Sequence, residues 1–107
     1  MRDFIFIANV VTALMQAMDT RLPGEPVFNI CTGSATSVLE LAHTVAGLCG
    51  RDVAIRFRAA RHGEVAHSYG DPTAARQGLG LSSSTELRIG LAATLAWLEG
   101  VGEASRP

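Results

Sequence analysis

Residues 27–42 read VFNICTGSATSVLELA, and this stretch decides the fold class. Its first five residues, VFNIC, are mostly apolar or β-branched and predict a short buried strand. A turn follows, and Ser37 and Glu40 then form a capping box, in which each side chain is placed to bond the other residue's backbone amide. A strand that leads through a turn into a capped helix predicts an α/β unit.

Two further apolar runs predict strands on either side of this unit. Residues 4–7 read FIFI, and residues 53–57 read VAIRF with alternating character. Together with residues 27–31 they predict a small three-stranded sheet. The stretch from residue 58 to residue 70 has no periodicity and is expected to be irregular.

Four helices are expected around this sheet. The first begins after Asn9 as a candidate N-cap and ends near residue 19, and the second follows the capping box and ends at Gly50, where a left-handed residue is expected. A short third helix begins at Asp71 and Pro72 and runs to about residue 77. The fourth is capped by Ser84 or Thr85.

Length and composition fit one small globular domain. The chain has 107 residues, of which 48% are hydrophobic and 18% charged, so residues 1–107 are expected to form a single domain with a disordered tail at residues 100–107. A net charge of −1 provides no basic field for nucleic acid. The apolar run near the start is too short to span a membrane.

The two cysteines, Cys31 and Cys49, lie far apart and have no metal-binding spacing. We therefore expect reduced thiols, no metal site and a cytoplasmic location.

Six segments together resemble a known family. They are RDFIFIANVV at 2–11, FNICTG at 28–33, SVLELA at 37–42, RHGEV at 61–65, residues 71–81, and residues 90–98 with the pattern GL-x-x-T-x-x-W-L. In this order and spacing they are similar to the C-terminal part of the NAD-dependent epimerase/dehydratases, which are extended short-chain dehydrogenase/reductases acting on nucleotide sugars. The resemblance implies the C-terminal, substrate-binding portion of that α/β fold.

The resemblance also implies what the chain does not carry. Members of the family bind NAD at a glycine-rich turn and use a Tyr-x-x-x-Lys pair for catalysis. Here the single tyrosine is Tyr69 and the sequence contains no lysine. We therefore expect NAD in the parent enzyme, no cofactor and no turnover for this chain alone, and a missing N-terminal Rossmann part.

The resemblance assigns five residues to the substrate, a nucleoside diphosphate sugar that we expect to be UDP-linked. Arg61 would bind the diphosphate through its guanidinium fork, Glu64 would accept from the ribose hydroxyls, and Gly63 would let the backbone approach the ligand. Arg2 corresponds to a second phosphate-binding arginine, and Phe4 to a position where some members have tyrosine. The structural alternatives are a solvated Arg61, an ion pair of Glu64 with an arginine, a plain turn glycine and a core phenylalanine.

A second function from a different class stays open. The chain would then be a non-catalytic module that dimerises or complements a separate N-terminal half. Either function predicts self-association or a partner, because the family fold would leave an apolar face uncovered. A Tyr-x-x-x-Lys pair encoded upstream in frame would favour the enzyme.

Overall fold

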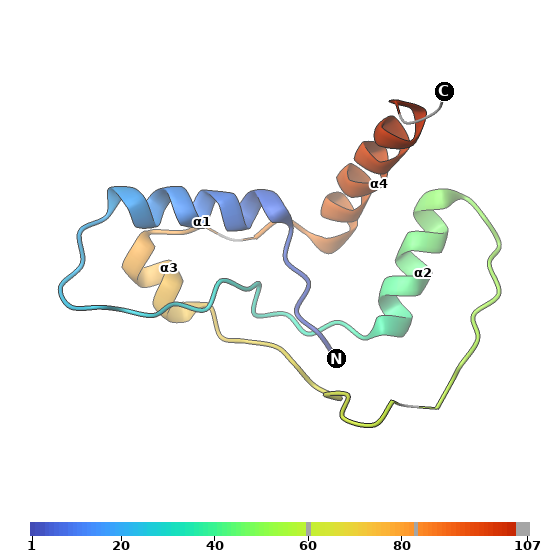
Figure 1. The fold of residues 1–107 in the computed structure, drawn as a ribbon, viewed down its shortest axis with the longest axis horizontal. Coiled ribbons are helices and arrows are strands. Elements are labelled where there is room, and N and C mark those ends of the chain that lie inside the picture. The colour runs from blue at the N-terminus through green and yellow to red at the C-terminus, as the bar shows by residue number, and fades with distance from the viewer. Residues whose placement is uncertain (60, 83, 105–107) are drawn as a thin grey trace.

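The computed structural model describes residues 1–59, 61–82 and 84–104, which contain four helices joined by long extended segments (Figure 1). The helices are α1 (Ile7–Asp19), α2 (Val38–Cys49), α3 (Thr73–Leu79) and α4 (Leu87–Ala104). Helix α1 packs beside α3, and α2 packs beside α4. The arrangement is therefore two helix pairs rather than one layered sandwich.

The molecule is open for its length. Its radius of gyration is 17.0 Å, whereas a compact domain of this size has about 13 Å. Among the described residues, the buried hydrophobic core consists of Ala13 of α1 and Ala75 and Leu79 of α3, two helices that contact each other; Pro72 and Gly90 are also buried. A core of two alanines and a leucine buries little apolar area, so much of the hydrophobic surface of this chain is left for other contacts.

The predicted three-stranded sheet is not present in the described residues. Backbone pairing there consists of two isolated bridges, an antiparallel one from Arg2 to Thr36 and a parallel one from Arg2 to Ser68. A strand exists only where a neighbour completes its hydrogen-bond ladder, and the segments at residues 27–31 and 53–57 have no such ladder. Val27 and Phe57 are 90% and 80% exposed, so these runs are apolar without being covered.

The first predicted strand, at residues 4–7, is not formed either, and α1 begins at its last residue, Ile7. Phe6 occupies the N-cap position and makes no side-chain capping bond. Asn9, the expected cap, lies within the first turn, and its side-chain oxygen instead accepts from the amide of Thr85 at 3.0 Å. The residue is thus used to hold the start of α1 against the segment that leads into α4.

The ends of α2 agree with the sequence pattern. The hydroxyl of Ser37 accepts from the amide of Glu40 at 3.0 Å, and Gly50 ends the helix with a φ of 65°. A glycine adopts this left-handed conformation without the strain that a Cβ would cause. Local side-chain chemistry therefore determines both ends of this helix.

Helices α3 and α4 are both longer than expected. The expected start of α3 is one residue too early, because Pro72 is the N-cap and Thr73 the first helical residue. The carboxylate of Asp71 still accepts from the amide and the hydroxyl of Thr73, at 3.0 and 2.6 Å. Helix α4 continues to Ala104, so residues 100–104 of the segment expected to be a disordered tail are helical, and residues 105–107 lie outside the described part. Within that part, no helix is both long and apolar enough to cross a membrane.

Candidate functional site

The backbone around Arg2 joins three segments that are far apart in the sequence, and we call this meeting point the Arg2 junction (residues 1–3, 32–36 and 66–68). Arg2 exchanges two backbone hydrogen bonds with Thr36, at 2.9 and 2.8 Å. On the other side, Asp3 donates to the carbonyl of Ser68 at 3.1 Å, and Ser68 donates to Met1 at 2.9 Å. The extended N-terminal segment therefore lies between the other two.

The side chain of Asp3 locks this junction. One carboxylate oxygen accepts from the amide and the hydroxyl of Thr32, at 2.9 and 2.6 Å, and the other accepts from the amide of Gly33 at 2.9 Å. Gly33 has a φ of 81°, so a side chain at this position would be strained, and its amide faces the carboxylate. Asp3 thus binds the turn at residues 32–34 through both oxygens.

The electrostatics of Asp3 follow from these contacts. Burial raises the pKa of its carboxyl, but hydrogen bonds from Thr32 and Gly33 favour the ionised form more strongly, so the net pKa is lowered. Burial and the nearby carboxylate of Asp3 raise the pKa of the Cys31 thiol. Asp3 is therefore a carboxylate at neutral pH and Cys31 is a neutral thiol.

Helix α3 reaches the same turn through an arginine that sequence reasoning missed. One guanidinium nitrogen of Arg76 donates to the carbonyl of Thr32 at 2.9 Å. Arg76 and Arg88 both line an open polar cavity of about 530 Å³ beside the turn, together with hydroxyl side chains of residues 32–36 and 84–85. Nothing in the spacing of these residues along the sequence predicts that they meet.

The turn of Arg61, Gly63 and Glu64 lies in the open. The Arg61 side chain is 88% exposed and its Nε lies 3.8 Å from an oxygen of Glu64, while the Glu64 amide donates to the Arg61 carbonyl at 3.2 Å. Gly63 has a φ of 85°, and a Cβ built on it would have no atom within 4 Å. The predicted ion pair of Glu64 with an arginine is therefore present, and space beside the turn is free.

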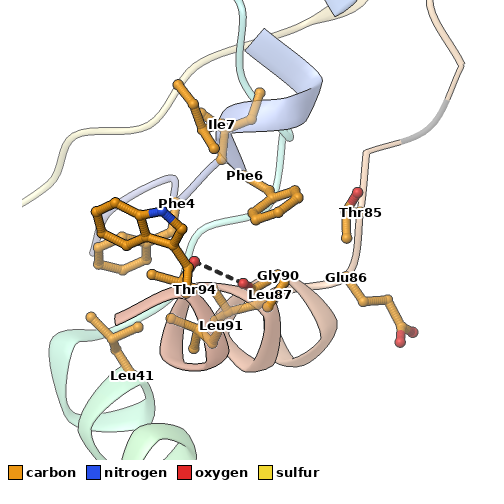
Figure 2. Close-up of a pocket in the computed structure, with 13 residues that line it drawn as sticks. Phe4, Phe6, Ile7, Leu41, Thr85, Glu86, Leu87, Gly90, Leu91 and Thr94 are labelled. Carbon is orange, nitrogen blue, oxygen red and sulfur yellow. Dashed lines mark hydrogen bonds between the residues drawn. The ribbon is translucent and has the colours of Figure 1, made fainter. Parts of the chain in front are cut away.

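Phe4 separates two cavities. It lines the polar cavity just described and also an apolar one of about 620 Å³, formed by residues 4–7, Leu41 of α2 and the first turns of α4 with Trp97 (Figure 2). The Phe4 ring is thus half-buried: it is not fully packed in a core, and it is not fully exposed to solvent. In Figure 2, Phe4 and Phe6 lie above α4, with Leu41 and Leu91 below them.

The structure thus brings together some of the residues that the sequence singled out, and not others. Arg2 lies in the Arg2 junction, Phe4 directly follows the junction segment at 1–3, and Glu64 precedes the junction segment at 66–68 by two residues. The Arg61 turn itself takes no part in the junction's hydrogen bonds that the described residues make. Guanidinium groups and hydroxyls suit the binding of phosphate and ribose, which need donors and acceptors but no proton transfer.

Comparison with known proteins identifies the family. A comparison with models of protein families found no match. UDP-glucose 4-epimerase of Mycolicibacterium smegmatis is 35% identical over 94 residues, which cover 88% of this chain and 30% of that enzyme. The UDP-glucose 4-epimerase of Bacillus subtilis is 29% identical over 98 residues, covering 90% of this chain and 29% of the enzyme.

A solved structure agrees with the sequence relatives. The complex of MoeE5 with UDP-glucuronic acid and NAD superposes with a TM-score of 0.85 at 37% identity, covering 92% of this chain and 33% of MoeE5. The chain thus spans about a third of the length of the proteins it matches. The chain therefore belongs to the NAD-dependent epimerase/dehydratase family and corresponds to the C-terminal part of its nucleotide-sugar epimerases.

Proposed function

We propose that this chain is the nucleotide-sugar-binding C-terminal part of an NAD-dependent sugar epimerase or dehydratase, and that it is not catalytic alone. The observation that carries the proposal is the match to MoeE5, whose structure holds UDP-glucuronic acid and NAD, across 92% of this chain. The relatives named UDP-glucose 4-epimerase support the same class of substrate. The ligand we expect is a UDP-linked sugar.

In this proposal the Arg61 turn binds the nucleotide. The guanidinium of Arg61 would take the diphosphate in a bidentate manner, and a phosphate would then replace Glu64 as its partner. Glu64, released from the weak exposed pair, would accept from the ribose hydroxyls. The open space beside Gly63 supports a close backbone approach by the ligand.

Arg2 and Phe4 would complete the substrate contacts. The backbone of Arg2 is fixed in the junction, while its guanidinium makes a single 3.1 Å bond to the adjacent Met1 carbonyl. Replacing this hydrogen bond with one to a phosphate would therefore cost the guanidinium little free energy. These residues would bind and orient the sugar. Orientation lowers the activation barrier of the reaction through proximity, and it requires no acid or base from this chain.

NAD would belong to the parent enzyme. The chain has no lysine, and the segment that leads into α1 is Phe4, Ile5 and Phe6 rather than a glycine-rich turn. Its own residues therefore do not fit a dinucleotide, and no step of the chemistry is assigned to them. We propose that residues 1–107 act as one unit beside a Rossmann part that holds the cofactor.

The proposal is tested by following the amide resonances of the labelled chain during titration with UDP and, separately, with UDP-glucose. We expect a dispersed spectrum in which residues 61–65 and the Arg2 junction shift. Arg61→Gln should abolish the shifts, whereas Arg51→Gln, which changes an exposed arginine at the end of α2, should not. A dispersed spectrum that UDP leaves unchanged would refute nucleotide binding.

One observation favours the second function, an assembly module. Five apolar side chains at helical spacing form an exposed stripe along α1: Ile7, Val11, Leu14, Met15 and Met18. Burying such a stripe is favourable by about 25 cal/mol per Å² of apolar surface. The stripe would be covered by a second copy of the chain or by the N-terminal half of the parent enzyme.

A further inference from the structure

We propose that Asp3 is a positioning residue for nucleotide binding: it sets the place of Arg2 relative to the segment that follows the Arg61 turn. The inference rests on the proposed function, because it concerns the same phosphate-binding arginines. It adds a residue that the family resemblance did not assign, and it rests on the hydrogen bonds of the Arg2 junction.

Asp3 is unsuited to touch the ligand itself. Both of its oxygens accept hydrogen bonds within the chain, from Thr32 twice and from Gly33 once. A carboxylate beside a bound diphosphate would also repel it, because both are negative. Its influence on a ligand must therefore pass through the backbone that it holds.

That backbone includes both parts of the proposed site. The residue before Asp3 is Arg2, which bonds Thr36 through both its amide and its carbonyl. The amide of Asp3 itself donates to Ser68, four residues after Glu64. Fixing Asp3 to the turn at residues 32–33 therefore fixes Arg2 on one side and the end of the Arg61 loop on the other.

The turn that Asp3 holds is itself anchored. Arg76 of α3 donates to the carbonyl of Thr32, so the turn is bound to a helix as well as to the N-terminal segment. Asp3 thus connects the open N-terminal segment to the helical pair of α1 and α3. Removal of its charge leaves Arg2 held by its backbone bonds to the half-buried Thr36. Because these bonds lie outside a packed core, they should open more readily.

The test is a double-mutant cycle on the full 107-residue chain, with UDP affinity measured by calorimetry. Asp3→Asn puts an NH₂ group or a weaker acceptor against the Gly33 amide. Arg2→Gln removes the guanidinium and leaves the backbone pairing with Thr36 available. We expect Asp3→Asn to weaken UDP binding about tenfold in the wild-type background and by less than about twofold with Arg2→Gln, because Asp3 acts through Arg2.

Two further variants separate positioning from general loss of structure. Thr32→Ser keeps the amide and the hydroxyl and should retain wild-type affinity. Asp52→Asn makes the same substitution at an exposed carboxylate outside the Arg2 junction and should leave UDP affinity within about twofold. In the absence of ligand, Asp3→Asn should also speed hydrogen exchange at the amides of Thr36 and Ser68.

The outcomes are distinguishable. Failure of the wild-type chain to bind UDP would refute the proposed function, and the inference with it. Binding by the wild type together with unchanged affinity or unchanged amide exchange in Asp3→Asn would refute the positioning role alone. An equal loss of affinity in both backgrounds of the cycle would also contradict it, because Asp3 would then act independently of Arg2.

Discussion

The side-chain oxygen of Asn9 accepts a hydrogen bond from the backbone amide of Thr85 at 3.0 Å, across 76 residues of sequence. The bond joins the first turn of α1 to the segment that enters α4. Because the buried core of the described residues is small, such a polar contact between distant segments should matter for how α1 and α4 are held together.

Loss of this contact should destabilise the fold. Asn9→Ala leaves a half-buried amide without its partner, and we expect the free energy of unfolding to fall by about 1 kcal/mol. Asn9→Asp keeps an acceptor and should recover most of the loss. Urea unfolding followed by circular dichroism measures both, and Gln16→Ala on the exposed surface of α1 is the control. An Asn9→Ala chain as stable as the control would show that the bond contributes nothing.

Local signals in the sequence predicted the helices better than the sheet. Ser37 and Gly50 specify the ends of α2 through contacts within four residues, and such contacts need no distant partner. A strand needs a second segment in register, and the runs at residues 27–31 and 53–57 have none in this chain. Asn9 shows the same dependence on distant segments. It has the side chain of a good helix cap, but it instead accepts a hydrogen bond from Thr85, which only the tertiary fold brings near.

Two helical glycines should respond oppositely to alanine. A Cβ at Gly47 in α2 would meet nothing within 4 Å, so Gly47→Ala should gain about 0.5–1 kcal/mol from helix propensity. A Cβ at Gly90 in α4 would lie 3.2 Å from two atoms of Phe6, so Gly90→Ala should lose about 1 kcal/mol. Thermal unfolding of the two variants checks this. Equal stabilisation by both would mean that Phe6 does not pack on Gly90.

Stability should fall in acid partly because of Asp3. The folded pKa of this carboxyl lies below its unfolded value, so its contribution is present above about pH 4 and is lost as the pH falls through the folded pKa. Asp71, whose pKa is lowered chiefly by its bonds to Thr73, titrates in the same window. The comparison of wild type with Asp3→Asn isolates Asp3: the two stability curves should converge below pH 4. If the stability of the two proteins differed by the same amount at every pH, the loss of stability in acid could not be attributed to Asp3.

The exposed stripe on α1 should drive self-association of the isolated chain. Leu14 and Met15 are each 60% exposed, and replacing both with Gln should shift sedimentation towards the monomer. Val27 is 90% exposed but lies outside the stripe, so Val27→Gln is a matched control that should change nothing. A wild-type chain that sediments as a clean monomer at high concentration would contradict association through α1.

The site was only partly predictable from the sequence. Arg61 and Glu64 are three residues apart, and their ion pair follows from that local spacing. Asp3 and Arg76 meet at the Thr32 turn from positions 29 and 44 residues away. Hydrogen bonds over such separations depend on how the segments are brought together, which no local pattern encodes.

Calorimetric titration with UDP decides whether the Arg61 turn binds the diphosphate of a nucleotide sugar. We expect saturable binding by the wild type, a loss of affinity of about tenfold or more in Arg61→Gln, and no change in the Arg51→Gln control. Uridine, which has no phosphate, should bind far more weakly. Equal UDP affinity in the wild type and Arg61→Gln, or no binding by a folded wild-type chain, would contradict the claim.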